Sequence, residues 1–68
     1  MDEDEVSTLN VGDRFLFQDS WFTVIGIYNH PHAPGWKQIA VKERALKPIN
    51  LPGTRTIAIR RANGGSEY

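Results

Sequence analysis

The stretch RFLFQDSWFTVIGIY, residues 14–28, decides the fold class of this chain. Both of its halves, residues 14–18 and 21–28, are rich in aromatic and β-branched side chains, which favour a pleated and half-buried surface. Only Asp19 and Ser20 separate the halves, and this is the length of a tight hairpin loop. The stretch therefore predicts a β-hairpin.

The second half of this hairpin carries apolar side chains on both faces, whereas a strand with one solvated face carries them on one. One parity holds Phe22, Val24 and Tyr28, and the other holds Trp21, Ile25 and Ile27. A bulge or bend at Gly26 would shift the register, so that Phe22, Val24 and Ile27 all point inward. Alternatively, Trp21 and Ile25 form an exposed apolar patch for a partner or a dimer mate. The two interpretations are compatible.

Two further segments show the alternation of half-buried strands. Residues 29–35 (NHPHAPG) break regular structure, because proline fixes φ and removes a backbone donor. Alternation then returns over residues 36–43 and again over residues 54–61. The expected inward pairs are Ile39 with Val41, and Ile57 with Ile59.

The segment between these strands, residues 44–51, is ambiguous. It is either a loop or a short strand interrupted at Pro48, which would suit a sheet edge. Pro52-Gly53 predicts a turn with Pro52 at the first central position and Gly53 at positive φ in the second. Four or five short strands without a convincing helix predict a small closed or nearly closed barrel.

Length and composition place this barrel in a single domain. The chain has 68 residues and no cysteine, which excludes disulfides and thiolate metal sites. We expect an acidic, disordered start over residues 1–5, the barrel over residues 6–61 and a flexible tail over residues 62–68. The start lacks the pattern of a secretory signal, and no apolar stretch approaches the ~20 residues that span a bilayer. A cytoplasmic domain without membrane contact is the expectation.

The segment LNVGDRF, residues 9–15, followed by a hairpin, resembles the L-x-V-G-D entry of KOW, Tudor and other SH3-like barrels. The next strand of such modules often reads W-[FY]-x-V, and Trp21-Phe22-Thr23-Val24 matches this habit. The resemblance spans residues 9–61 and extends to short actinobacterial and phage proteins. It implies an all-β, five-stranded SH3-like barrel, in which the Gly-Asp turn feeds the first strand. Ordinary turn chemistry assigns Gly12 to the bend and Asp13 to the capping of backbone N–H groups.

Charge is divided unevenly along the chain. Residues 1–5 (MDEDE) contain four acids, whereas residues 36–61 contain seven bases and Glu43 as their single acid. A basic groove with a tryptophan as stacking surface would suit single-stranded nucleic acid. The opposite parity of Lys37 and Lys42 in one strand argues against a single patch. In the alternative interpretation, the basic residues simply occupy the solvated side of each strand. The acidic start would either mask the basic half or serve solubility.

Other chemistry has little support. His30-Pro31-His32 offers two nitrogen ligands, but a structural zinc site needs four, so that Asp19 or Glu43 would have to complete it. No nucleophile elbow or phosphate-binding loop is present, and a barrel of this size has little room for a catalytic cleft. We therefore expect neither an enzyme nor a cofactor or metal.

Two binding functions follow. The first is a non-catalytic protein–protein adaptor or modulator, for example phage-encoded and acting on a host protein, that uses Trp21, Ile25 and the loop around Trp36. It rests on the two-sided apolar strand and the net charge of +0. The alternative is nucleic-acid binding by the basic half. Its candidate residues are Lys37, Lys42, Arg44, Arg55, Arg60 and Arg61.

Overall fold

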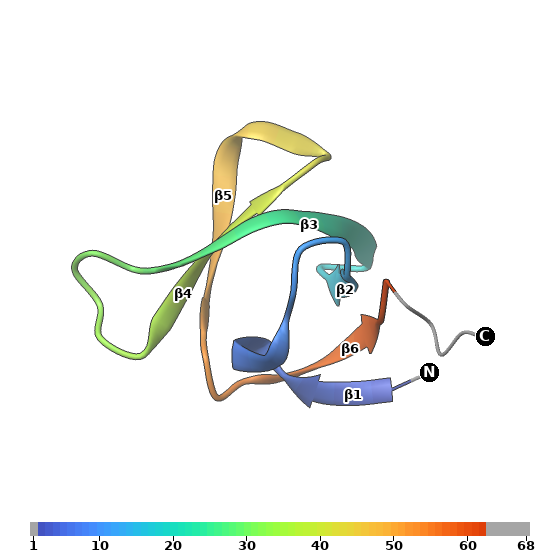
Figure 1. The fold of residues 1–68 in the computed structure, drawn as a ribbon, viewed down its shortest axis with the longest axis horizontal. Helices are drawn as coiled ribbons and strands as arrows, with labels where there is room; N and C mark the ends of the chain where they lie inside the picture. Colours follow the sequence, from blue (N-terminus) through green and yellow to red (C-terminus); the bar gives the residue numbers. More distant parts are fainter. Residues whose placement is uncertain (1, 63–68) are drawn as a thin grey trace.

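A computed structural model describes residues 2–62 of the chain. Its elements are β1 (Asp2–Glu5), the 3₁₀ helix η1 (Val6–Thr8), β2 (Arg14–Phe17), β3 (Ser20–Asn29), β4 (Trp36–Val41), β5 (Arg44–Pro52) and β6 (Thr56–Arg60). Neighbouring strands are antiparallel, in the order β1-β6-β2-β3-β4-β5 (Figure 1). The fold is a single all-β domain. Its sheet is not closed into a barrel, because β1 and β5 form its two ends.

The five predicted strands correspond to β2–β6, and β1 is a sixth that the sequence did not indicate. The prediction that residues 1–5 are disordered is wrong for Asp2–Glu5, which pairs with β6 from Asp2↔Ile59 to Glu5↔Thr56. The free backbone N–H and C=O groups along the edge of β6 bind those of residues 2–5, and these hydrogen bonds outweigh the low β-propensity of Asp and Glu. Of the predicted tail, only Ala62 lies within the described residues.

The β2–β3 hairpin is confirmed, but its loop lies one residue earlier than predicted. Phe17 pairs with Ser20, so Gln18 and Asp19 form the two-residue loop. Both have positive φ, 51° and 66° respectively, as expected for the turn whose twist matches that of paired strands. Ser20 therefore begins β3 instead of ending the turn.

The predicted irregularity near Gly26 is also confirmed. The β3–β4 register shifts between Val24 and Gly26, which leaves Ile25 in a bulge. Val24 before the bulge is buried, and Ile27 after it packs against the core. Ile25 itself is 53% exposed. The extra residue therefore explains why both parities of β3 are apolar.

The ambiguous segment, residues 44–51, is a strand at the edge of the sheet, and Pro48 lies within it. The β4–β5 register passes from Ile39↔Ile49 to Val41↔Arg44, so residues 45–48 face a single residue of β4. We call residues 45–48 the β5 arch. In Figure 1 it curves away from β4 at the top of the view.

The turn after β5 differs from its prediction. Arg55 N donates to Pro52 O (3.1 Å), so Pro52 precedes the two central residues, and Gly53 is not among the residues with positive φ. Glycine is needed at position 53 for space, because a Cβ there would lie 3.0 Å from Gly35 O. Gly53 N also donates to that oxygen (2.8 Å), which ties the turn to the β3–β4 loop.

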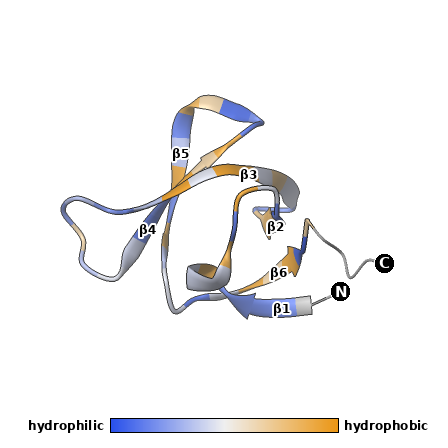
Figure 2. Cartoon of the chain, viewed as in Figure 1, coloured by the Kyte–Doolittle hydropathy of each residue, from blue (hydrophilic) through white to orange (hydrophobic). Residues whose placement is uncertain are grey.

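The core lies inside the curled sheet. Figure 2 shows β1 as hydrophilic and apolar residues along β2, β3 and β6. Ile39, Val41, Ile57 and Ile59 are all buried, as predicted from the alternation. The other buried apolar residues are Val6, Leu9, Phe15, Phe22, Val24, Ile49 and Leu51. Among residues 2–62, no helix is long and apolar enough to cross a membrane.

Candidate functional site

A cleft of about 510 Å³ opens where β5 and β6 approach the β2–β3 turn. Leu51 and Ile57, both buried, and the half-buried Phe17 line it with apolar surface. Trp36, Pro52 and Arg55 also line it. Its remaining lining residues are Leu16, Gln18 and Asn50, so among residues 2–62 Arg55 is its one charged residue and no carboxylate lines it. This volume falls within the range of small-ligand pockets, ~300–1,000 Å³.

Backbone hydrogen bonds hold Trp36 at the edge of this cleft. Trp36 N donates to Ala33 O (3.0 Å), and His30 N donates to Trp36 O (2.9 Å), which closes the loop between β3 and β4. The preceding Gly35 has φ of 83°, a conformation that glycine adopts without strain. Trp36 pairs with Pro52, and its side chain is 41% exposed. A hydrogen-bonded loop therefore presents an indole beside a cleft of mixed apolar and polar lining.

A second surface lies on the outer face of the sheet. Because Phe15 and Phe22 point inward, their neighbours Arg14 and Trp21 point outward. The Arg60 guanidinium lies 4.5 Å from the centroid of the Trp21 ring, and Arg60 is the cross-strand partner of Arg14. Trp21 is half-buried in this arrangement. Of the three predicted partner-binding residues, only Trp36 lines the cleft.

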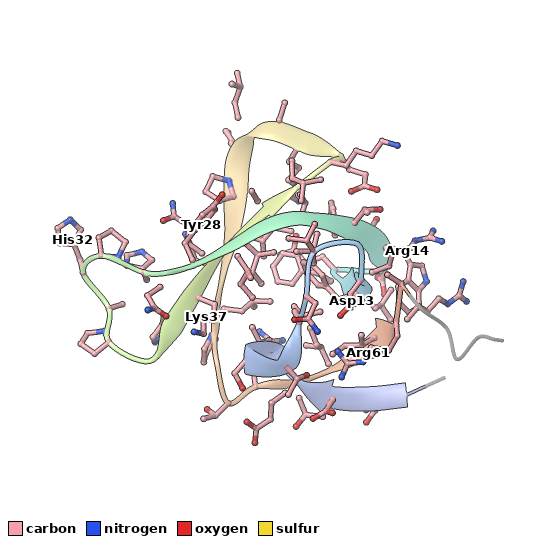
Figure 3. All side chains as sticks on the ribbon, in the orientation of Figure 1. Asp13, Arg14, Tyr28, His32, Lys37 and Arg61 are labelled. Carbon is pink, nitrogen blue, oxygen red and sulfur yellow. The ribbon has the colours of Figure 1, made fainter. Side chains whose placement is uncertain are left out.

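Arg61 serves a different purpose from Arg60. Its Nη1 donates to Asp13 Oδ2 (3.1 Å) and Thr8 O (3.0 Å), and its Nη2 donates to Asp4 Oδ2 (3.2 Å) and Thr8 Oγ1 (3.1 Å). Figure 3 shows Arg61 and Asp13 close to each other near the end of β6. Arg61 therefore joins β1, η1 and the turn before β2, and its donors are engaged within the domain.

The other predicted nucleic-acid residues are dispersed. Lys37 Nζ donates to Asn29 Oδ1 (2.7 Å) near the β3–β4 loop. Lys42 stands in the β4–β5 turn, and the Arg44 guanidinium lies 5.0 Å from the Phe22 ring centroid. Arg55 lines the cleft. These bases thus lie at separate places in the fold. The parity argument for Lys37 and Lys42 does not apply, because β4 ends at Val41 and Lys42 lies outside it.

Glu43 binds β3 at Thr23, where the pairing of β3 with β2 ends and its pairing with β4 begins. Its Oε1 accepts from Thr23 N (2.8 Å), and its Oε2 accepts from Thr23 Oγ1 (3.0 Å). The backbone N–H of Thr23 is the main cause that lowers the pKa of Glu43 below its ordinary value. Since Thr23 pairs with Arg14, a carboxylate also lies near the outer face.

The histidine pair and the β5 arch complete the inventory of candidate groups. His32 N donates to His30 Nδ1 (3.1 Å), and the two ring centroids are 6.3 Å apart. The described part of the chain holds no group of three or more His, Cys, Asp or Glu side chains placed to bind a metal ion. In the β5 arch, Leu46 is 94% exposed. It is the most exposed of the large hydrophobic residues described.

Sequence reasoning missed Arg14, Pro52 and the cleft itself. Arg14 lies outside the basic half that supplies the candidate residues, although its parity opposite to that of Phe15 indicates a solvated side chain. The cleft is lined by residues of four strands, and a local sequence pattern does not predict which distant strands come together. A comparison of the chain with protein-family models, curated proteins and solved structures finds no match in any of the three.

Proposed function

We propose that this protein is a non-catalytic binding module that holds an extended segment of a partner protein in the cleft beside Trp36. One observation carries the proposal: an open cleft of about 510 Å³ combines an apolar lining with an indole and a proline. Exposed aromatic side chains that hold an extended chain are a recurring way to bind peptides. This cleft supports the adaptor hypothesis.

The cleft indicates the chemistry of the bound segment. Apolar side chains of the partner would displace water from Phe17, Leu51 and Ile57, which line the cleft. Arg55 is exposed and forms none of the ion pairs found among residues 2–62, so a carboxylate of the partner would meet it. The expected ligand is an extended peptide with an apolar residue close to an acidic one.

Trp21 and Ile25 belong to this proposal in a secondary role. Leu16 is the cross-strand partner of Trp21 and also lines the cleft, so a long segment would continue onto the outer face. Ile25 protrudes from the β3 bulge and offers a further contact. The resemblance to SH3-like modules fits the same proposal, with β2–β6 as the five strands of the module and β1 as an addition.

Selection from a random-peptide display library on the immobilised protein tests the proposal. We expect enrichment of peptides with neighbouring apolar and acidic residues, and a loss of their affinity of about tenfold or more in Trp36→Ala and in Arg55→Ala. Leu46→Ala and Lys47→Ala are matched controls, because they remove an exposed apolar group and a base outside the cleft. Peptides that bind Trp36→Ala and Arg55→Ala as tightly as the unmodified protein would refute the cleft as the site.

A further inference from the structure

Arg14 and Arg60 place two like charges side by side on the outer face of the sheet. They are direct cross-strand partners on β2 and β6, and both are exposed. The ion pairs found among residues 2–62 involve Arg61 instead. Like charges directly opposite each other destabilise a sheet. A bound anion would remove this repulsion.

Trp21 adds a flat aromatic surface beside the two arginines. The Arg60 guanidinium lies 4.5 Å from the centroid of the Trp21 ring. A guanidinium over an indole is attracted by the ring, and its planar fork keeps N–H donors at its edge for a phosphate. The exposed side of the Arg60 group is then open to a second planar molecule. The surface therefore combines anion binding with stacking.

We propose that Arg14, Arg60 and Trp21 form a binding site for single-stranded nucleic acid. Arg14 and Arg60 contact phosphates, and an unpaired base stacks on the Arg60–Trp21 pair. Unpaired strands offer both groups at once, whereas a duplex keeps the faces of its bases within the stack. None of the three residues lines the cleft, so nucleic-acid binding here can be tested apart from the cleft. A peptide long enough to reach the outer face would compete with nucleic acid at Trp21.

The surroundings of the site set the expected strength. Glu43 is bound to Thr23, the other cross-strand partner of Arg14, and the whole chain has a net charge of +0. Binding is therefore expected to be weak and local. With two phosphates neutralised, the logarithm of affinity should fall with the logarithm of salt concentration with a slope of about −1.4.

Fluorescence of Trp21 provides a direct readout, since the chain has two tryptophans and Trp36→Phe leaves Trp21 alone. An oligothymidylate of about 10 nucleotides should quench this fluorescence. In the same background, Arg14→Gln and Arg60→Gln should each weaken binding about tenfold. Arg14→Gln should leave the fold intact or slightly more stable, because it removes the like-charge contact. This separates a binding role from a structural one.

Lys47→Gln is the matched control, because it removes the same charge at an exposed position of the β5 arch. Equal weakening by Lys47→Gln and Arg14→Gln would overturn the proposal, since net charge alone would then explain binding. So would an absence of quenching at low salt. A polyglutamate that quenches Trp21 and competes equally well would reassign the site to acidic segments of proteins. If peptide selection at the cleft fails, each of these fluorescence results can still be interpreted, because none of them uses a peptide bound in the cleft.

Discussion

Asp13 accepts hydrogen bonds on both oxygens of a carboxylate that is almost fully buried. Oδ1 accepts from Ala62 N (2.8 Å), and Oδ2 accepts from Asn10 N (2.9 Å) and from Arg61 Nη1 (3.1 Å). The turn chemistry of Val11-Gly12-Asp13 predicts that this aspartate caps backbone N–H groups, and the hydrogen bonds from Asn10 N and Ala62 N confirm it. The same contacts tie the turn before β2 to the end of β6.

Replacing Asp13 by Asn should destabilise the fold by about 3 kcal/mol. The new amide NH₂ group would replace one carboxylate oxygen, and it would then face N–H donors from which that oxygen now accepts hydrogen bonds. A domain of this size typically has about 3–5 kcal/mol in total, so a largely unfolded population is expected. Urea denaturation followed by fluorescence measures the loss. Arg61→Gln keeps both backbone hydrogen bonds of Asp13 and should cost less; the reverse ranking would contradict this account.

Glu43 provides a pH-dependent test at the same scale. Its pKa is lowered in the folded protein, chiefly by the Thr23 N–H, so its contribution to stability is present above the unfolded pKa and is lost as pH falls through the folded value. NMR titration of the Glu43 carboxyl carbon should show a midpoint below the ordinary value. In Thr23→Val the hydroxyl donor is lost while the N–H remains, so the midpoint should rise only partway. A Glu43 pKa at or above its ordinary value would contradict the hydrogen bonds described.

At the scale of elements, the turn before β2 depends on Gly12. Gly12 has φ of 97°, and its N–H donates to Val24 O (2.8 Å), so the turn continues the contact between β2 and β3. A Cβ at this position would also lie 3.0 Å from the Cβ of Ala62. Backbone conformation and space therefore both require glycine.

We expect Gly12→Ala to lower the free energy of unfolding by about 1–3 kcal/mol, the cost of a strained backbone conformation. Gly26→Ala is the comparison, because Gly26 lacks a positive φ, and the three atoms nearest to its Cβ would all belong to the Tyr28 side chain. Tyr28 is 60% exposed and can rotate away, so the loss there should be smaller. Thermal unfolding of the two variants decides the order, and a more stable Gly12→Ala than Gly26→Ala would be inconsistent with the turn.

The β5 arch shows how the exposed end of an edge strand is kept from pairing. Residues 45–48 face a single residue of β4, so this part of β5 leaves the regular ladder. Lys47 adds a charge, and Pro48 has no N–H to offer a neighbouring strand. Irregular backbone, lysine and proline are recognised means of discouraging edge-to-edge association. The exposed Leu46 is thereby displayed on a segment that does not extend the sheet.

At the scale of the whole molecule, β1 covers the outer edge of β6 and brings the acidic start beside the end of the described chain (Figure 1). Glu3, Asp4 and Glu5 are all exposed, so β1 contributes backbone pairing and little burial. The Asp4–Arg61 ion pair adds a contact between partly exposed groups, which is typically worth under ~1 kcal/mol.

Deletion of residues 1–5 should lower stability by about 2 kcal/mol through the loss of this pairing, and should expose the edge of β6. Calorimetry would show a reduced Tm, and light scattering would show association that increases with concentration. Asp4→Ala removes the ion pair alone and should change both properties little. A truncated protein with an unchanged Tm would contradict the pairing of β1 with β6.

The sequence by itself determined the local features of this protein. Alternation and turn chemistry located β2, β3, β4 and β6. The apolar residues on both faces of β3 indicated either a bulge near Gly26 or an exposed apolar patch. These features follow from neighbours in the chain. The choice between a loop and a strand at residues 44–51 remained open, since Pro48 suits an edge strand and a loop alike.

Only the tertiary structure decided which distant segments of the chain meet. The acidic start became a strand because β6 offered it free backbone groups, and no local propensity of Asp or Glu predicts that. Arg60 and Arg61 are adjacent in sequence, yet one lies over Trp21 on the outer face and the other bonds Asp13 and Asp4. The cleft beside Trp36 and the pairing of Arg14 with Arg60 likewise join distant segments, because strand order and sheet curvature are properties of the whole fold.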